Sequence, residues 1–94
     1  MKTFKDLEFK THPMGDGVQA LIYFDNGYGA SVVRSEHTYG GSDGLYELAV
    51  LKNGNITYDT HITNDVIGYL KEEKVTDYLG QIQELWKILL IRKY

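Results

Sequence analysis

Three histidines, at positions 12, 37 and 61, are the side chains of this 94-residue chain best suited to bind a transition metal. Each falls in a predicted loop, and no two have the spacing that would place both imidazoles on one helix face. The chain contains no cysteine, so a thiolate metal site and a cysteine nucleophile are excluded. The sequence therefore predicts no metal site and no cofactor.

Catalytic arrangements have little support. Ser31, Ser35 and Ser42 offer hydroxyls, but none lies in the Gly-x-Ser-x-Gly pattern of a nucleophile elbow. The glycine-rich stretch at residues 27–31 lacks the Gly-Lys-Ser/Thr of a phosphate-binding loop and precedes a predicted strand. Carboxylates are frequent, but a catalytic pair needs a cleft that raises the pKa of one acid, which so small a domain seldom forms. We therefore expect a chain that is not an enzyme, with a small enzyme acting on a metabolite as the weakest alternative.

The segment from Ser35 to Gly44 is the candidate binding element. It has ten residues where hairpin loops usually have two to five, and three of them are glycines. Connections of this length are more often functional or mobile than short ones, and both interpretations stay open here. The functional interpretation predicts an exposed patch for partner binding, made of Glu36, His37, Tyr39 and Asp43.

The charge distribution limits the partners. The net charge is −3, but residues 11–70 hold seven carboxylates against Arg34 and Lys52, a net charge of −5 over this stretch. Such a surface repels phosphate, which argues against direct nucleic-acid binding and leaves a basic protein surface as a compatible partner. No apolar run approaches the ~20 residues of a membrane span, and the first residues lack the apolar stretch of a signal peptide. The sequence thus predicts a cytoplasmic protein without membrane contact.

The elements that must position this loop form one predicted α+β domain over residues 1–94. Two-residue periodicity favours strands at residues 7–11, 18–24, 28–34, 45–52 and 56–60. Asn-Gly pairs at residues 26–27 and 53–54 favour tight hairpin turns, and so an antiparallel meander of four to five strands. In the strand at 45–52, the alternation places Tyr46, Leu48 and Val50 toward the core.

The periodicity then changes to that of a helix. A short helix is predicted over residues 65–70, with Thr63 or Asn64 as its cap. One long C-terminal helix starts near Lys71 and packs one apolar stripe on one face of the sheet. The stripe consists of Val75, Tyr78, Leu79, Ile82, Leu85, Trp86 and Leu89.

Two isoleucines fall outside this stripe. Ile88 and Ile91 lie on the opposite helix face, which upstream is polar. Three interpretations stay open: the helix ends near Lys87, the two side chains are ordinary exposed residues, or they form a small contact between two copies of the chain. We favour the third, a weak homodimer.

Four phrases of the sequence carry a resemblance: FDNGYGASVVR at 24–34, GLYELAVL at 44–51, ITYDT at 56–60 and DVIGYL at 65–70. Over about residues 4–86 the chain resembles a group of small uncharacterised proteins encoded by bacteriophages and prophages. The resemblance implies a phage origin and a cytoplasmic location in an infected bacterium. It implies no reaction and assigns no functional residue.

These observations favour a non-catalytic binding protein. A small acidic protein without a catalytic arrangement suits a stoichiometric inhibitor, which needs a contact surface of only about 800 Å². With the implied phage origin, the expected partner is a host protein, such as a nuclease of a host defence system. The alternative is a module that sequesters a small molecule or nucleotide through the glycine-rich loop and its aromatic residue.

Overall fold

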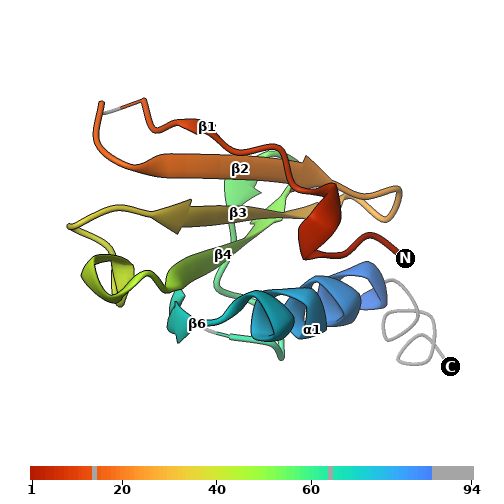
Figure 1. The fold of residues 1–94 in the computed structure, drawn as a ribbon. Coiled ribbons are helices and arrows are strands. Elements are labelled where there is room, and N and C mark those ends of the chain that lie inside the picture. Colours follow the sequence, from red (N-terminus) through yellow and green to blue (C-terminus); the bar gives the residue numbers. More distant parts are fainter. Residues whose placement is uncertain (14, 64, 86–94) are drawn as a thin grey trace, which may run out of the picture.

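The computed structural model describes residues 1–13, 15–63 and 65–85 of the chain. Over these residues it is an α+β fold, as predicted, with an antiparallel sheet and one α-helix that covers one face of it (Figure 1). The strands are β1 (Lys10–Thr11), β2 (Val18–Tyr23), β3 (Tyr28–Arg34), β4 (Tyr46–Lys52), β5 (Asn55–Ile56) and β6 (Ile67–Leu70). The helices are the 3-10 helices η1 (Phe4–Asp6) and η2 (Gly41–Asp43) and the α-helix α1 (Glu72–Gln83).

The sheet is the predicted meander with one strand more. Strands β1 to β5 follow one another in spatial order, and each pairs antiparallel with the next. Beyond β5, strand β6 also pairs with β4, so Leu70 lies opposite Tyr46 and Ile67 opposite Leu48. The sheet therefore has six strands within the described residues, where the sequence predicted four to five.

The hydrophobic core lies between the sheet and α1. Leu48 and Val32 are fully buried and directly paired across β4 and β3. From α1, Val75, Leu79 and Ile82 have no exposed surface, which confirms the predicted stripe over this part of the helix. On the opposite sheet face, Leu21, Tyr23 and Ile56 remain at least half exposed.

The short helix predicted over residues 65–70 is wrong. The chain there forms strand β6, because β4 still has an unpaired edge at Tyr46–Leu48 that this segment can complete. Pairing with β4 buries Leu70, while Gly68 weakens any helix at this position. The Thr63 hydroxyl binds the Asp65 backbone in a turn, so the predicted cap is part of a turn that leads into a strand.

The C-terminal helix lies where it was predicted but is shorter. Helix α1 has 12 residues, an ordinary length, and carries Glu72 and Glu73 in its first turn. Trp86, Ile88 and Ile91 lie outside the described residues, so the predictions for them stay predictions. Among residues 1–13, 15–63 and 65–85, no helix combines the length and apolar character that crossing a membrane requires.

The first and fifth strands are also shorter than predicted. Phe4–Asp6 forms a turn of 3-10 helix, and the rings of Phe4 and Phe9 pack against the ring of Tyr46 at centroid distances of 5.2 and 5.4 Å. This aromatic contact and the hydrogen bonds of the Lys2 and Phe4 N–H groups to Gln83 and Thr76 of α1 hold the segment before Lys10, which precedes β1.

Candidate functional site

The loop from Ser35 to Gly44 is built by its own hydrogen bonds. The Thr38 hydroxyl accepts from the Ser35 N–H and donates to the Ser35 carbonyl, both at 3.0 Å. Further on, the Gly41 N–H donates to the Thr38 carbonyl and the Leu45 N–H to the Gly40 carbonyl. Gly41 lies so close to Ser35 that an added Cβ would overlap the Ser35 carbonyl oxygen. These bonds and the close packing favour one fixed conformation over a mobile connection.

Tyr39 is held at the centre of this loop by two backbone hydrogen bonds. Its N–H donates to the Glu47 carboxylate at 2.8 Å, and its carbonyl accepts from the Tyr69 N–H at 3.1 Å. The predicted residue Tyr39 is therefore joined to Tyr69 of β6, 30 positions further along the chain. Both residues are 62% exposed, and we call these two residues, whose backbones are joined, the tyrosine surface.

The backbone at Tyr69 has an unusual conformation. The pairing of β6 with β4 contains an irregularity, because two steps along β4 correspond to three along β6. Tyr69 lies in this bulge with φ at 58°, in the left-handed region that bulky residues rarely adopt. Bulges of this kind turn a side chain to a new direction, and here the residue involved is an exposed aromatic.

Two glycines allow the tyrosines to approach so closely. A Cβ at Gly68 would lie 2.4 Å from the Tyr39 Cβ, and a Cβ at Gly40 would lie 2.9 Å from the Tyr69 Cα. Gly68 thus packs against Tyr39, which precedes Gly40 in the chain. Gly40 in turn packs against Tyr69, which follows Gly68. The tyrosine surface depends on glycine at both positions.

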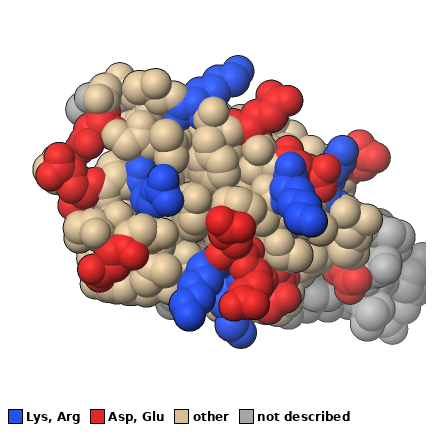
Figure 2. All heavy atoms as spheres, viewed as in Figure 1, with Lys and Arg blue, Asp and Glu red and all other residues tan. Residues whose placement is uncertain are grey.

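Glu36 and His37 belong to a second group on the same loop. The His37 Nε2 lies 3.1 Å from the Asp16 Oδ2, and one ligand atom each from Asp16, Glu36 and His37 lies within 4.8 Å of the other two. Asp16 comes from the turn between β1 and β2. The two loops therefore meet at one end of the sheet, where acidic side chains gather at the left of Figure 2.

The four predicted residues thus divide between two places. Tyr39 faces β6, while Glu36 and His37 face the turn before β2. Asp43 is exposed in η2, where its N–H donates to the Gly40 carbonyl. All four are exposed, as predicted, but their contacts lie with different parts of the chain.

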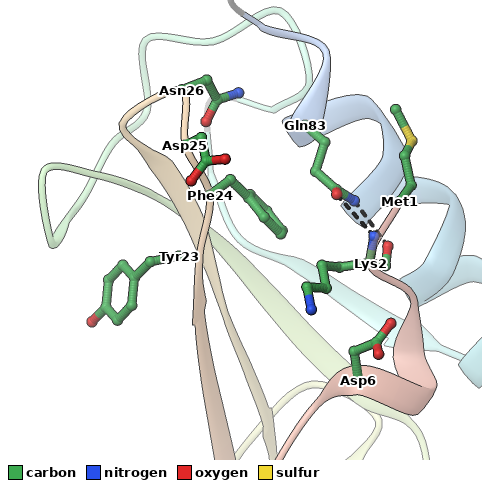
Figure 3. A pocket seen from close by; sticks show the side chains of 8 residues that line it. All are labelled: Met1, Lys2, Asp6, Tyr23, Phe24, Asp25, Asn26 and Gln83. Atoms are coloured by element: carbon green, nitrogen blue, oxygen red, sulfur yellow. Dashed lines mark hydrogen bonds between the residues drawn. The ribbon is translucent and has the colours of Figure 1, made fainter.

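A pocket of about 620 Å³, seen from close by in Figure 3, opens near the N-terminus. Figure 1 shows that the N-terminus lies toward the other end of the sheet from the loop between β3 and β4. Gln83 of α1 binds the Lys2 backbone through two hydrogen bonds, of 2.9 and 2.8 Å, at its edge. The pocket is lined by Met1, Lys2, Asp6, Tyr23, Phe24, Asp25, Asn26 and Gln83, none of them from the loop at 35–44. A small ligand held there would not use the glycine-rich loop that the sequence suggested for it.

Sequence analysis missed Tyr69, Glu47 and Asp16 as members of these groups. Tyr69 was assigned to a helix, and the approach of Asp16 to His37 depends on how two separate loops fold. The glycine before Tyr69 was the one local indication of a close backbone approach in a strand.

Comparison with protein-family models, curated proteins and solved structures found no match. The resemblance to phage-encoded proteins therefore stays a prediction.

Proposed function

We propose that this chain is a non-catalytic protein-binding domain whose contact surface centres on the tyrosine surface, Tyr39 and Tyr69. The observation that carries the proposal is that two tyrosines, each 62% exposed, are joined to each other by a hydrogen bond between their backbones. Tyrosine is enriched at the energetic centre of protein interfaces, because it offers a large contact area with few rotatable bonds.

The backbone conformation supports a functional role. A non-glycine residue with φ at 58° lowers stability by about 1–2 kcal/mol. Glycine or asparagine would adopt this conformation more easily than the exposed Tyr69 does. The ring remains mostly in solvent and regains little of this energy by burial. Strain of this kind is typical of positions that present a side chain to a partner.

The charges around the tyrosine surface indicate a basic partner. Glu47 holds the Tyr39 N–H, and residues 35–45, which carry Tyr39, contain Glu36 and Asp43 and no lysine or arginine, while Lys71 follows Tyr69 by two positions. Tyrosine rings also attract the ammonium and guanidinium groups of a partner. A protein surface rich in lysine and arginine complements this end of the domain.

The partner that we propose is a host protein of an infected bacterium, in the cytoplasm, such as a defence nuclease. Nucleases bind the phosphate backbone through basic surfaces, which have the charge that this end of the domain complements. The phage origin that the resemblance implies supports this choice. An acidic protein that occupies a nuclease's basic surface would inhibit it without any chemistry of its own.

The experiment is affinity capture from a bacterial lysate, with quantitative mass spectrometry. Tyr39→Ala should lose the specific partner, while Tyr58→Ala, which removes a 50% exposed tyrosine elsewhere, should retain it. Capture should also weaken as salt rises, because a charged interface is screened. Equal capture by both variants, or capture that does not respond to salt, would contradict the proposal.

A small-ligand function is the second candidate, because the 620 Å³ pocket falls in the size range of ligand sites. Lys2 offers a cation there for an anionic ligand, whereas Asp6 and Asp25 oppose one (Figure 3). Native mass spectrometry of the protein after incubation with lysate separates the two candidates. A co-purifying small molecule would support the second, and a protein complex the first.

A further inference from the structure

The meeting of two loops at the acidic end of the sheet places three different metal-ligand groups together. One ligand atom each from Asp16, Glu36 and His37 lies within 4.8 Å of the other two, and the His37 Nε2 is 3.1 Å from the Asp16 Oδ2. An imidazole with two carboxylates is a ligand set that proteins use for zinc and related divalent ions. We propose that Asp16, Glu36 and His37 bind a divalent transition-metal ion of the zinc type in an open surface site.

The spacing of the three groups is close to what the ion requires. Ligands bound to zinc at about 2.1 Å in a tetrahedron are about 3.4 Å apart. The 3.1 Å separation of the His37 Nε2 and the Asp16 Oδ2 is within about 0.3 Å of this value, and the 4.8 Å limit leaves at most about 1.4 Å to close. Glu36 is exposed, so rotation of its side chain can close the gap without a change of backbone.

The surrounding charge favours a cation. With a neutral imidazole the group carries two negative charges, and the two loops that form it contain no lysine or arginine. The basic residue that precedes the loop, Arg34, places its guanidinium over the Tyr46 ring, 5.2 Å from the centroid. It also donates to the Tyr46 hydroxyl, so this cation is engaged on the core side of β3.

The two loops are tied together independently of the three side chains. The His37 N–H donates to the Ser35 hydroxyl at 3.1 Å, which fixes the start of the loop. Beside it, Gly17 approaches so closely that an added Cβ would lie 2.2 Å from the Arg34 carbonyl oxygen. The backbone that carries Asp16 is therefore packed against the backbone that carries Glu36 and His37.

An ordinary surface ion pair would explain the contact between His37 and Asp16, but it does not explain why the Glu36 carboxylate also lies close to both residues. A metal site uses all three residues and leaves further positions of the ion open to water or to a partner's side chain. The inference does not rest on the proposed function, because it is argued from the positions of Asp16, Glu36 and His37 and not from Tyr39 or Tyr69.

The test is isothermal titration calorimetry of the full-length, tag-free chain with ZnCl2. We expect one saturable site per chain, with His37→Gln and Glu36→Gln each weakening zinc binding by at least about tenfold. His61→Gln, which removes an exposed histidine from another loop, should leave the affinity unchanged. Mg²⁺, which prefers oxygen ligands in an octahedron, should bind at least about tenfold more weakly than Zn²⁺.

The same titration followed by NMR gives a second measurement. The His37 imidazole resonances should shift on addition of ZnCl2, and those of His61 should not. Zinc affinity that is unchanged by His37→Gln, an equal loss in His61→Gln, or no saturable binding at all would overturn the inference. Because Tyr39→Ala should bind zinc like the wild type, failure of this site and failure of the tyrosine surface are distinguishable.

Discussion

Replacing Gly68 by alanine tests the contact between β6 and the binding loop. The added Cβ would lie 2.4 Å from the Tyr39 Cβ, whereas non-bonded carbon atoms need about 3.5 Å, so Tyr39 must move by about 1 Å. Overpacking of this kind costs about 1–3 kcal/mol, and the reduced entropy of the unfolded chain returns about 0.4–1 kcal/mol. We expect a net loss of about 1–2 kcal/mol in the free energy of unfolding, together with weaker partner binding.

Gly80→Ala is the matched control, since it adds the same methyl group where there is room. Gly80 lies within α1, and its nearest neighbour to an added Cβ is the Met1 sulfur at 3.9 Å, an ordinary contact. Alanine in a helix interior is favoured over glycine by about 1 kcal/mol, so this variant should be more stable than the wild type.

Urea unfolding followed by far-ultraviolet circular dichroism measures both variants. The midpoint should fall for Gly68→Ala and rise for Gly80→Ala, with little change in the slope of either transition. A Gly68→Ala protein as stable as the wild type would refute the reasoning. It would mean that Tyr39 does not pack on β6 and that the tyrosine surface is not fixed.

Three further predictions concern the scaffold and self-association. Leu48→Ala should cost about 2–5 kcal/mol because Leu48 is fully buried, while Leu21→Ala, at a half-exposed position, should cost less than about 1 kcal/mol by urea unfolding. Asn26→Asp should lower the free energy of unfolding by about 1–2 kcal/mol, measured by thermal unfolding. It removes the 2.8 Å hydrogen bond from the Asn26 amide to the Ile82 carbonyl in the last turn of α1, and it adds a negative charge at that helix end. An unchanged stability would contradict this role. For the proposed weak homodimer, sedimentation equilibrium should show association that Ile88→Lys with Ile91→Lys abolishes, and a wild type that stays monomeric at high concentration would exclude it.

The sequence predicted well those parts of the fold that local patterns determine. The third strand begins and ends where alternation placed it, at Tyr28 and Arg34, and the core face of β4 is the predicted one. The turn at Asn53 and Gly54 has positive φ at both residues, as the Asn-Gly pair predicted. In each case neighbouring residues decide the conformation.

Predictions failed where distant segments decide the conformation. Residues 67–70 form a strand because they pair with an otherwise unpaired edge of β4. The residues of this segment alone do not show that such an edge exists. The same strand brings Tyr69 to Tyr39, so the tyrosine surface could not be found before the strand was known. The loop itself could be identified from its length, since a ten-residue connection between strands is unusual whatever surrounds it.

The most direct test of the tyrosine surface is site-specific photo-crosslinking. A photoreactive phenylalanine derivative replaces Tyr39 in one protein and Tyr58 in another, so an aromatic ring is kept at each exposed position. After irradiation in bacterial lysate, we predict a discrete crosslinked protein from position 39 and none from position 58. Crosslinking from position 58 alone, or no discrete product from position 39, would contradict the account.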